Sequence, residues 1–225
     1  MNPVLLVTHN CLELTKKCVA SVQEQTISVD ILVIDNASTD GTREWLSEQG
    51  IKAMLFDTNI GVSIAWNVGL ELAFKNHGHC LVVNNDTKLP PYFYNKLLSY
   101  DLSFVTGVSV DDLSNHPEEW KQPAEYPDFS AFLIRRSCWC AVGRFDQRMK
   151  FYASDCDYAV RAHRAGIGMV NAGVPFHHER SSTLKHATAE ERTEIQAQAD
   201  EDRRVFKSIY GCFPWESGYS KLFTN

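Results

Sequence analysis

The sequence lacks several features that mark large classes of proteins. No apolar stretch approaches the roughly 18 residues that a membrane-spanning helix requires, and we expect neither such a helix nor a signal peptide. No run of Lys or Arg is longer than two residues, and the net charge is −6. Because nucleic acids are bound mainly through basic contacts to phosphates, we expect no nucleic-acid partner.

Two common nucleotide-binding motifs are also absent. The chain has no G-x-x-x-x-G-K-[ST] sequence, which excludes a P-loop, and no G-x-G-x-x-G follows the first predicted strand, which argues against a dinucleotide Rossmann site. The seven cysteines are scattered, odd in number and without a C-x-x-C pair. This pattern favours reduced thiols in a cytoplasmic protein over a disulfide framework or a zinc site.

The first half of the chain alternates short apolar segments with segments of helical period. We predict strands at 3–7, 31–34, 52–56 and 79–83. Helices are predicted at 12–25, from the cap at Thr39 or Asp40 through Leu46, and at 61–75. Three strand–helix repeats of this kind predict a parallel sheet with right-handed crossovers.

The second half is less regular. It contains predicted strands at 104–110, 130–134 and 167–170, helices at 154–165 and 187–209, and a charged surface segment at 111–127. The tail is rich in aromatic residues, which indicates docking on this domain or on a partner. We therefore predict an α/β fold with one domain over residues 1–183. It would have a mainly parallel central sheet flanked by helices, with a C-terminal helix and aromatic tail, residues 184–225, packed on it.

Polar side chains follow three predicted strands at the point where each ends. They are Thr8, His9 and Asn10 after the first strand, Asp35, Asn36 and Ser38 after the second, and Asn84, Asn85 and Asp86 after the fourth. Because ligands collect at the carboxyl ends of strands in open α/β sheets, we expect the three clusters along one edge. Amides and a carboxylate suit the base and ribose of a nucleotide, and Asp86 suits Mg²⁺ or Mn²⁺ carrying phosphate oxygens. A turn that caps the next helix is the alternative for residues 84–86.

Six segments resemble, in order, the family 2 glycosyltransferases of the GT-A fold. They lie at residues 4–10, 33–42, 59–69, 83–87, 135–146 and 155–166, and the resemblance extends over about residues 3–183. The Asn-Asn-Asp sequence and the Gly-Arg-Phe-Asp segment are most similar to the rhamnosyltransferase-like branch. The resemblance implies an inverting enzyme that uses Mn²⁺ or Mg²⁺. It would move a sugar from a nucleotide-diphosphate donor, of the UDP or dTDP type, to a hydroxyl of a saccharide or glycan acceptor.

The resemblance also implies roles for individual residues. The contacts with the nucleotide-sugar would come from Thr8, His9, Asn10, Asp35, Asn67, Asn84 and Asn85. Asp86 stands at the last position of the D-x-D motif and would bind the metal, whose site His177 or His178 would complete. Asp155 matches the catalytic base, and Asp157 would lie on the acceptor side.

The chemistry of an inverting transfer fits the role of Asp155. Such a transfer needs a base for the proton of the acceptor hydroxyl and a cation for the departing diphosphate. At the beginning of a helix the dipole favours the ionised carboxylate, which lowers the basicity of Asp155, and the neighbouring Asp157 would partly restore it. Three features depart from the family pattern. Ser154 replaces the usual Glu before the base, His9 replaces a common Tyr, and Glu179-Arg180 follows the histidine pair where small residues are usual.

Several alternatives stay open at this point. Asp40 is more typical of a helix cap than of catalysis, and Asp157 fits an ion pair with Arg161 as well as an acceptor contact. The histidines fit ordinary surface positions too. A nucleotidyltransferase would need a basic, Gly-rich loop near the first strand, which is absent. A non-catalytic module that binds a nucleotide-sugar or glycan on the same fold is the other candidate, and Ser154 favours it.

Overall fold

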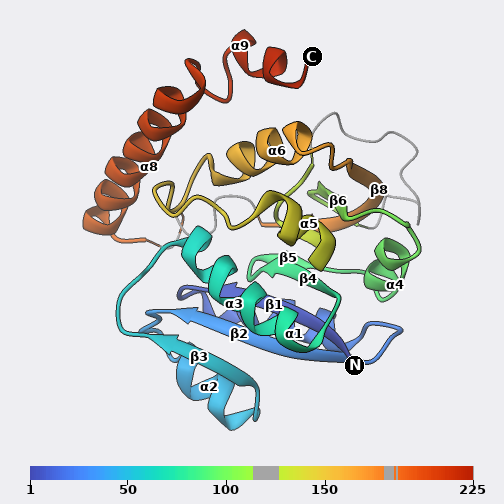
Figure 1. Ribbon diagram of the computed structural model, residues 1–225. Helices are drawn as coiled ribbons and strands as arrows, with labels where there is room; N and C mark the ends of the chain where they lie inside the picture. Colours follow the sequence, from blue (N-terminus) through green and yellow to red (C-terminus); the bar gives the residue numbers. More distant parts are fainter. Residues whose placement is uncertain (114–126, 180–184, 186, 225) are drawn as a thin grey trace.

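A computed structural model describes residues 1–113, 127–179, 185 and 187–224. Within these residues, eight strands form one sheet with the order β3-β2-β1-β4-β7-β6-β8-β5 (Figure 1). The strands are β1 (Asn2–Thr8), β2 (Val29–Asn36), β3 (Lys52–Phe56), β4 (His79–Asn84), β5 (Thr87–Lys88), β6 (Phe104–Val110), β7 (Ala131–Arg135) and β8 (Met169–His178). The helices are α1 (Leu12–Gln23), α2 (Thr42–Glu48), α3 (Val62–Asn76), α4 (Phe93–Leu98), α5 (Arg136–Val142), α6 (Ser154–Arg164), α8 (Ala189–Tyr210) and α9 (Ser217–Ser220), followed by the 3-10 helix η1 (Lys221–Phe223).

The sheet is mixed, with a parallel first half. β1 lies between β2 and β4 and is parallel to both, and β3 is parallel to β2. β7 is antiparallel to β4 and β6, whereas β6 and β8 are parallel and β5 is antiparallel to β8. The predicted α/β fold and the parallel strands of the first half are confirmed, but β7 and β5 reverse direction and the sheet is not parallel throughout.

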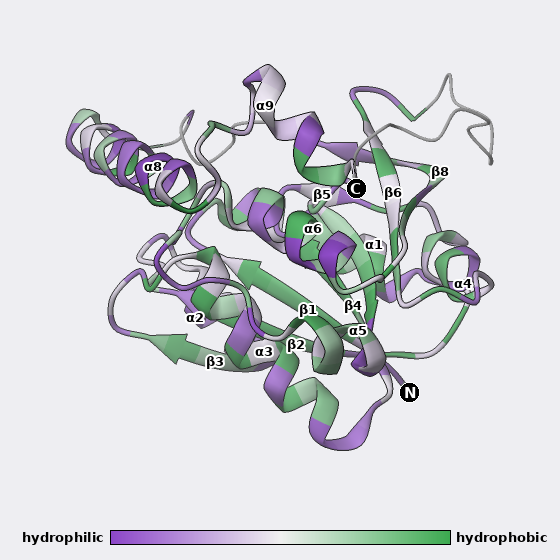
Figure 2. Cartoon of the chain, turned by 45° about the horizontal axis from the view of Figure 1, so that its top comes forward, coloured by the Kyte–Doolittle hydropathy of each residue, from purple (hydrophilic) through white to green (hydrophobic). Residues whose placement is uncertain are grey.

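Hydrophobic residues alternate along each central strand and fill two cores, one on each face of the sheet. Val4 and Leu6 face a core that α1, α2 and α4 cover. Leu5 and Val7 face the other core, which is built with α3, α5 and α6. Figure 2 shows the hydrophobic strands β1 and β4 enclosed by helices, while much of α8 is hydrophilic. The period of two along each strand therefore determines which helices meet which face.

Helix α3 approaches β1 closely because its sequence has a glycine at the contact. A Cβ atom on Gly69 would lie 2.2 Å from Cδ1 of Leu5, closer than any real packing allows. Any larger residue at this position would push α3 away from the sheet. This contact matters for the site, since the N-terminus of α3 supports the loop that leads into α6.

The C-terminal helix α8 begins with a capping box. The hydroxyl of Thr188 accepts a hydrogen bond from the backbone N–H of Glu191, whose carboxylate accepts one from the N–H of Thr188. Phe206 of α8 and Tyr219 of α9 pack with Met149, Ala153 and other residues in a third hydrophobic cluster beside α6. Among the described residues, no helix is both long and apolar enough to cross a membrane.

Most predicted elements are found within a few residues of the expected bounds, and the differences lie in the second half. The short helices α4 and α5 and the two-residue strand β5 were not expected, because elements of this length carry no clear periodicity. Strand β8 continues to His178, well beyond the predicted 167–170. Most of the predicted surface segment at 111–127 lies outside the described residues.

Candidate functional site

Three adjoining pockets lie at and beyond the carboxyl ends of the central strands. The first, which we call the strand-end pocket, has a volume of about 310 Å³. It is lined by Val7, Thr8, His9, Asn36, Asn59, Val62, Asn84, Asn85, Asp86, Phe151, Tyr152, His178 and Ile195. The polar clusters that follow β1, β2 and β4 therefore meet at one edge of the sheet. The register brings them together, because Thr8 pairs with Asp35 and Val7 with Asn84.

Two further pockets continue from the first. The central pocket, of about 530 Å³, shares Val62, Asn84, Phe151 and Tyr152 with the strand-end pocket and also contains Asp155. The tail pocket, of about 500 Å³, shares Pro127, Phe129 and Asp155 with the central pocket and extends to the C-terminal segment. The three pockets form one series, in which Asp155 stands between the second and the third.

Asn85 connects the turn after β4 to the turn after β1. Its Nδ2 atom lies 3.1 Å from Oγ1 of Thr8, 3.1 Å from Oγ1 of Thr15 and 3.2 Å from the carbonyl oxygen of Asn10. Thr8 and Thr15 also bond to each other through their hydroxyls. The amide of Asn85 and the hydroxyl of Thr8 thus hold the floor of the strand-end pocket.

The loops after β1 and β2 are joined by side chains of the predicted site. His9 donates from Nδ1 to the carbonyl oxygen of Asn36 at 2.6 Å. Oδ1 of Asn10 accepts from the backbone N–H of Thr39. Asn10 has a left-handed backbone with φ of 55°, and its side chain is not part of the pocket lining. His9 faces the pocket, whereas Asn10 supports it.

Asp35 is completely buried and forms an ion pair that sequence analysis did not anticipate. Its Oδ1 atom accepts from Nε of Arg43 at 2.6 Å and from the backbone N–H of Ser38 at 3.1 Å. Its Oδ2 atom is buried without a hydrogen-bond partner among the described residues. Arg43 also donates to the carbonyl oxygen of Phe56. An unpaired buried carboxylate oxygen is costly, and a polar ligand group that reached it would relieve that cost. Asp35 itself lines none of the three pockets.

Asp86 and His178 meet on the wall of the strand-end pocket. Oδ1 of Asp86 lies 3.3 Å from Nε2 of His178, and Nδ1 of His178 lies 3.2 Å from the hydroxyl of Ser130. Register explains the meeting, because His178 pairs with Thr87, the residue after Asp86. His177 lines a different pocket with Lys88 and acidic residues.

The Asp86–His178 pair fits a divalent cation. Carboxylate oxygen and imidazole nitrogen are both ligands that Mn²⁺ accepts, and Mg²⁺ or Mn²⁺ commonly takes few protein ligands when it also binds phosphate oxygens. In the part of the chain that the structure describes, no group of three or more His, Cys, Asp or Glu side chains could hold a metal. The site therefore offers two protein ligands and space for phosphate groups beside them.

A loop of four residues, Lys150–Ala153, separates the strand-end pocket from the tail segment and leads into α6. Its conformation is held from α3, where the hydroxyl of Ser63 donates to the carbonyl oxygen of Met149. Gly61 is required beside it, because a Cβ atom there would lie 2.7 Å from Cβ of Lys150. Ala153 has φ of 63°, a left-handed conformation that a non-glycine residue rarely adopts.

The same loop is held from the other side by Asp202 of α8, a residue that sequence analysis missed. Asp202 is completely buried. Its carboxylate accepts the backbone N–H groups of Lys150, Phe151 and Tyr152 at 2.8–3.0 Å and the side-chain amide of Gln198 at 2.8 Å. In the sequence, an Asp in a charged helix is indistinguishable from a solvated residue. Only the contacts with the loop reveal its role.

Asp155 lies in the first turn of α6 with its carboxylate in a low-polarity setting. Burial raises the pKa of this carboxyl group, and the nearby charge of Asp128 adds to the increase, while the hydrogen bond from the N–H of Cys156 at 2.8 Å offsets part of it. The raised pKa runs against the expected low basicity, because desolvation has a larger effect on this group than the hydrogen bonds that favour its ionised form. Asp155 also does not cap the helix, whose N-cap residue is Ala153.

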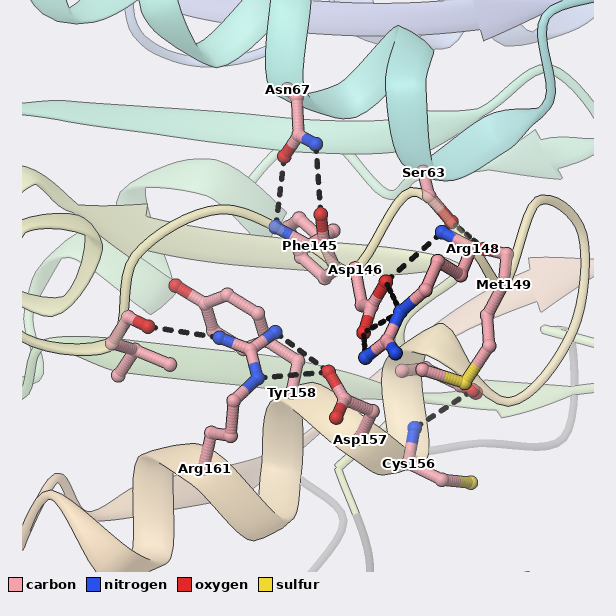
Figure 3. A network of polar contacts seen from close by, with 12 residues as sticks. Ser63, Asn67, Phe145, Asp146, Arg148, Met149, Cys156, Asp157, Tyr158 and Arg161 are labelled. Carbon is pink, nitrogen blue, oxygen red and sulfur yellow. Dashed lines mark hydrogen bonds and ion pairs between the residues drawn. The ribbon is translucent and has the colours of Figure 1, made fainter. Parts of the chain in front are cut away.

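Asp157 forms the predicted ion pair with Arg161. Its Oδ2 atom accepts from Nε and a terminal nitrogen of Arg161 at 2.8 and 2.7 Å (Figure 3). Its Oδ1 atom accepts from the hydroxyl of Tyr210. The residue is buried and lies outside the three pockets. This arrangement supports a structural role, with α6 joined to α8, and the expected contact of Asp157 with an acceptor gains no support.

The side chain of Asn67 in α3 also forms its hydrogen bonds within the protein. Its side chain donates to the carbonyl oxygen of Phe145 and accepts from the N–H of the same residue, both at 2.9 Å (Figure 3). It is 1% exposed and lines none of the three pockets. The predicted contact with a nucleotide-sugar gains no support here, and Asn67 instead holds the segment that leads to the Lys150–Ala153 loop.

Comparison with solved structures identifies the architecture. S. aureus TarS (1–349) in complex with UDP is 13% identical with a TM-score of 0.64, and the match covers 99% of this chain and 70% of that one. The mannosyltransferase PcManGT from Pyrobaculum calidifontis, in complex with GDP-Man and Mn²⁺, is 15% identical with a TM-score of 0.60 and coverages of 99% and 82%. GalNAc-T7 with UDP, GalNAc and Mn²⁺ is 12% identical with a TM-score of 0.65 and coverages of 95% and 58%. At these identities the likeness establishes the GT-A fold.

Sequence comparison identifies the family. A search among curated proteins found no significant match. The model of glycosyl transferase family 2, however, matches residues 4–150, which is more than half of the chain. The protein belongs to glycosyl transferase family 2.

Proposed function

We propose that this glycosyltransferase moves a sugar, with inversion, from a nucleotide-diphosphate donor to a hydroxyl group of a saccharide acceptor, with the help of a divalent cation. The observation that carries the proposal is the placing of Asp86 and His178 in a pocket that continues to Asp155. A group for the diphosphate and a group for the acceptor proton thus lie in one continuous series of pockets.

The nucleotide would bind at the ends of β1 and β2. Asp35 would supply the carboxylate for the base or ribose through its unpaired Oδ2 atom. Because Asp35 is fully buried and lines none of the three pockets, this contact would require the end of β2 to open as the nucleotide binds. His9 and Asn36 line the strand-end pocket and offer ring and amide groups to the nucleotide. TarS and PcManGT, which share the fold, are solved with UDP-GlcNAc and with GDP-Man. We propose UDP or dTDP as the nucleotide.

Asp86 and His178 would hold Mn²⁺ or Mg²⁺. When bound, the cation neutralises negative charge that develops on the departing diphosphate. Asn84, which lines both the strand-end pocket and the central pocket, is placed to contact the ribose or phosphate beside it. Asp86 also borders the pocket that His177 lines, but it is His178 that lies 3.3 Å from its carboxylate, and we assign the histidine ligand to His178.

Asp155 would act as the base. As the bond from the acceptor oxygen to the anomeric carbon forms and the bond from that carbon to the diphosphate oxygen breaks, the proton of the hydroxyl passes to the carboxylate of Asp155. Attack on the face opposite the leaving group inverts the anomeric centre. The raised pKa makes Asp155 a stronger base than an exposed aspartate, as this step requires.

Turnover measured with a panel of UDP-, dTDP- and GDP-sugars would test the proposal. Release of nucleoside diphosphate should depend on one nucleotide type, should stop with EDTA and should return with Mn²⁺ or Mg²⁺. Proton NMR of the product should show the opposite anomeric configuration from the donor. Full activity in EDTA would reject the metal, retained configuration would reject inversion, and donor binding without transfer would favour the non-catalytic module.

A further inference from the structure

The tail pocket has a composition that suits a neutral sugar. Its apolar surface comes from Pro127, Phe129, Ala159, Pro214 and Trp215, and its polar groups are mainly hydroxyls and carboxylates from Asp155, Glu216, Ser217, Tyr219 and Ser220. No Lys or Arg is among the described residues that line it. Because phosphate groups are bound by basic side chains, this lining disfavours an anionic ligand and suits a molecule with hydroxyls and one apolar face.

Trp215 is the most exposed aromatic residue in this lining and is nevertheless held in position. It is 64% exposed. Its ring stacks on Phe213 with centroids 4.8 Å apart and an interplanar angle of 5°, and the guanidinium of Arg203 lies 5.4 Å from the ring. The ring is therefore ordered before any ligand arrives. An ordered aromatic surface binds at low entropic cost.

The segment that carries Trp215 is anchored on the domain. Tyr219 is buried, with its ring 5.2 Å from Phe223 and 6.0 Å from Phe206. These residues pack with Met149 and Ala153 next to α6. The position of Trp215 relative to Asp155 is thus set by a hydrophobic cluster that joins the C-terminal segment to α6.

We propose that the tail pocket is the acceptor subsite and binds a neutral sugar residue whose apolar face packs against the exposed part of the Trp215 side chain. The hydroxyl that attacks the donor would be directed towards Asp155, which lines both the tail pocket and the central pocket. This inference rests on the proposed function for the role of Asp155. The lining without basic side chains adds one further point, which is that the acceptor sugar is neutral and not phosphorylated.

Saturation-transfer NMR in the absence of donor tests the subsite directly. The probes are the methyl glycosides of glucose, galactose, mannose and rhamnose, with the sugar 1-phosphates as an anionic series. The variants are Trp215→Ala, Trp215→Phe, and Leu55→Ala as the matched control, since Leu55 is an exposed hydrophobic residue on the distant strand β3. Removal of the exposed Trp215 ring should leave the fold intact, which the melting temperature would verify.

At least one neutral glycoside should bind more tightly than its phosphorylated counterpart. Trp215→Ala should weaken that binding by about tenfold, Trp215→Phe should restore most of it, and Leu55→Ala should leave it unchanged. No binding by any neutral glycoside, tighter binding of the sugar phosphates, or equal affinity in Trp215→Ala would overturn the proposal.

A donor-binding measurement separates this inference from the proposed function. Calorimetric titration with nucleoside diphosphate and Mn²⁺ should give the same affinity in Trp215→Ala as in the wild type, because Trp215 does not line the strand-end pocket. If the wild type binds no nucleotide but the glycoside effect holds, the proposed function fails and the sugar subsite stands. If nucleotide binds but the glycoside effect is absent, the subsite alone fails.

Discussion

The carboxylate of Asp86 lies 3.3 Å from Nε2 of His178, although 92 positions separate the two residues in the chain. The pairing of the two-residue strand β5 with the last residues of β8 makes this contact. Neither residue alone distinguishes a metal site from an ordinary turn or a surface histidine. Together, on the wall of a pocket, they present the carboxylate oxygen and imidazole nitrogen that the proposed divalent cation would bind.

Replacing either member of this pair should abolish metal-dependent binding of the donor. In Asp86→Asn and His178→Ala, we expect calorimetry to show loss of the increase in nucleotide-diphosphate affinity that Mn²⁺ produces. His177→Ala is the matched control, because His177 precedes His178 in β8 and its side chain lies on the opposite face of the strand. An Mn²⁺ effect lost in His177→Ala and kept in His178→Ala would reverse the assignment.

Asp35→Ala should weaken both nucleotide binding and the fold. We expect nucleotide affinity to fall by about 1–3 kcal/mol, because polar groups of the ligand lose their partner. The same change leaves Arg43 without its buried counter-ion, which should lower the free energy of unfolding by about 3 kcal/mol. Denaturant unfolding and calorimetry on the folded protein measure the two effects separately. Unchanged affinity in the folded variant would remove Asp35 from the nucleotide site.

Asp155→Asn should abolish most transfer while donor affinity is kept. General-base catalysis contributes on the order of 10²–10⁴ in rate, and kcat should fall by that factor. In the wild type, burial raises the pKa of Asp155, so the acid limb of the kcat profile should lie above the usual pKa of an aspartate, about 3.9. A kcat that Asp155→Asn leaves intact, or an acid limb at the ordinary value, would contradict the base role.

The raised pKa of Asp155 also predicts how stability depends on pH. A carboxyl group whose pKa is higher in the folded than in the unfolded state favours folding only below the unfolded pKa, and this contribution is lost as the pH rises through the folded pKa. An Asn side chain at this position does not ionise, so the folded variant does not have the cost of a buried carboxylate at neutral pH. Thermal unfolding should therefore show Asp155→Asn at least as stable as the wild type at neutral pH, with the difference disappearing in acid. A less stable variant at neutral pH would contradict this prediction.

Asp202→Asn should disturb catalysis from a distance. The amide cannot accept all three backbone N–H groups of the Lys150–Ala153 loop, so we expect a loss of about 2 kcal/mol in unfolding free energy and a lower kcat. Asp200→Asn on the exposed side of α8 is the control and should change stability by less than about 0.5 kcal/mol. A purely structural role for Asp202 would lower the melting temperature and leave kcat of the folded enzyme at the wild-type value.

The local sequence pattern alone predicts the secondary structure of the first half of this chain. The apolar run from Val4 to Val7 and the helical period of the following segment predict strand and helix without tertiary information, and β1 is accordingly buried on both faces. Parallel strands place their carboxyl ends together, and the polar clusters after β1, β2 and β4 could therefore be assigned to one edge of the sheet. The family resemblance then indicated Asp86 and Asp155.

Tertiary structure decided what each candidate side chain contacts. Asn67 and Asp157 carry the same functional groups as the pocket residues. However, Asn67 hydrogen-bonds to Phe145 and Asp157 pairs with Arg161, partners that burial and packing select. The choice between His177 and His178 depended on register, because a shift of one residue turns a strand side chain to the opposite face. Asp202 and Trp215 gained their roles only when α8 and the tail packed against α6 and its preceding loop. A sequence specifies periodicity locally, whereas contacts between distant segments exist only in the folded chain.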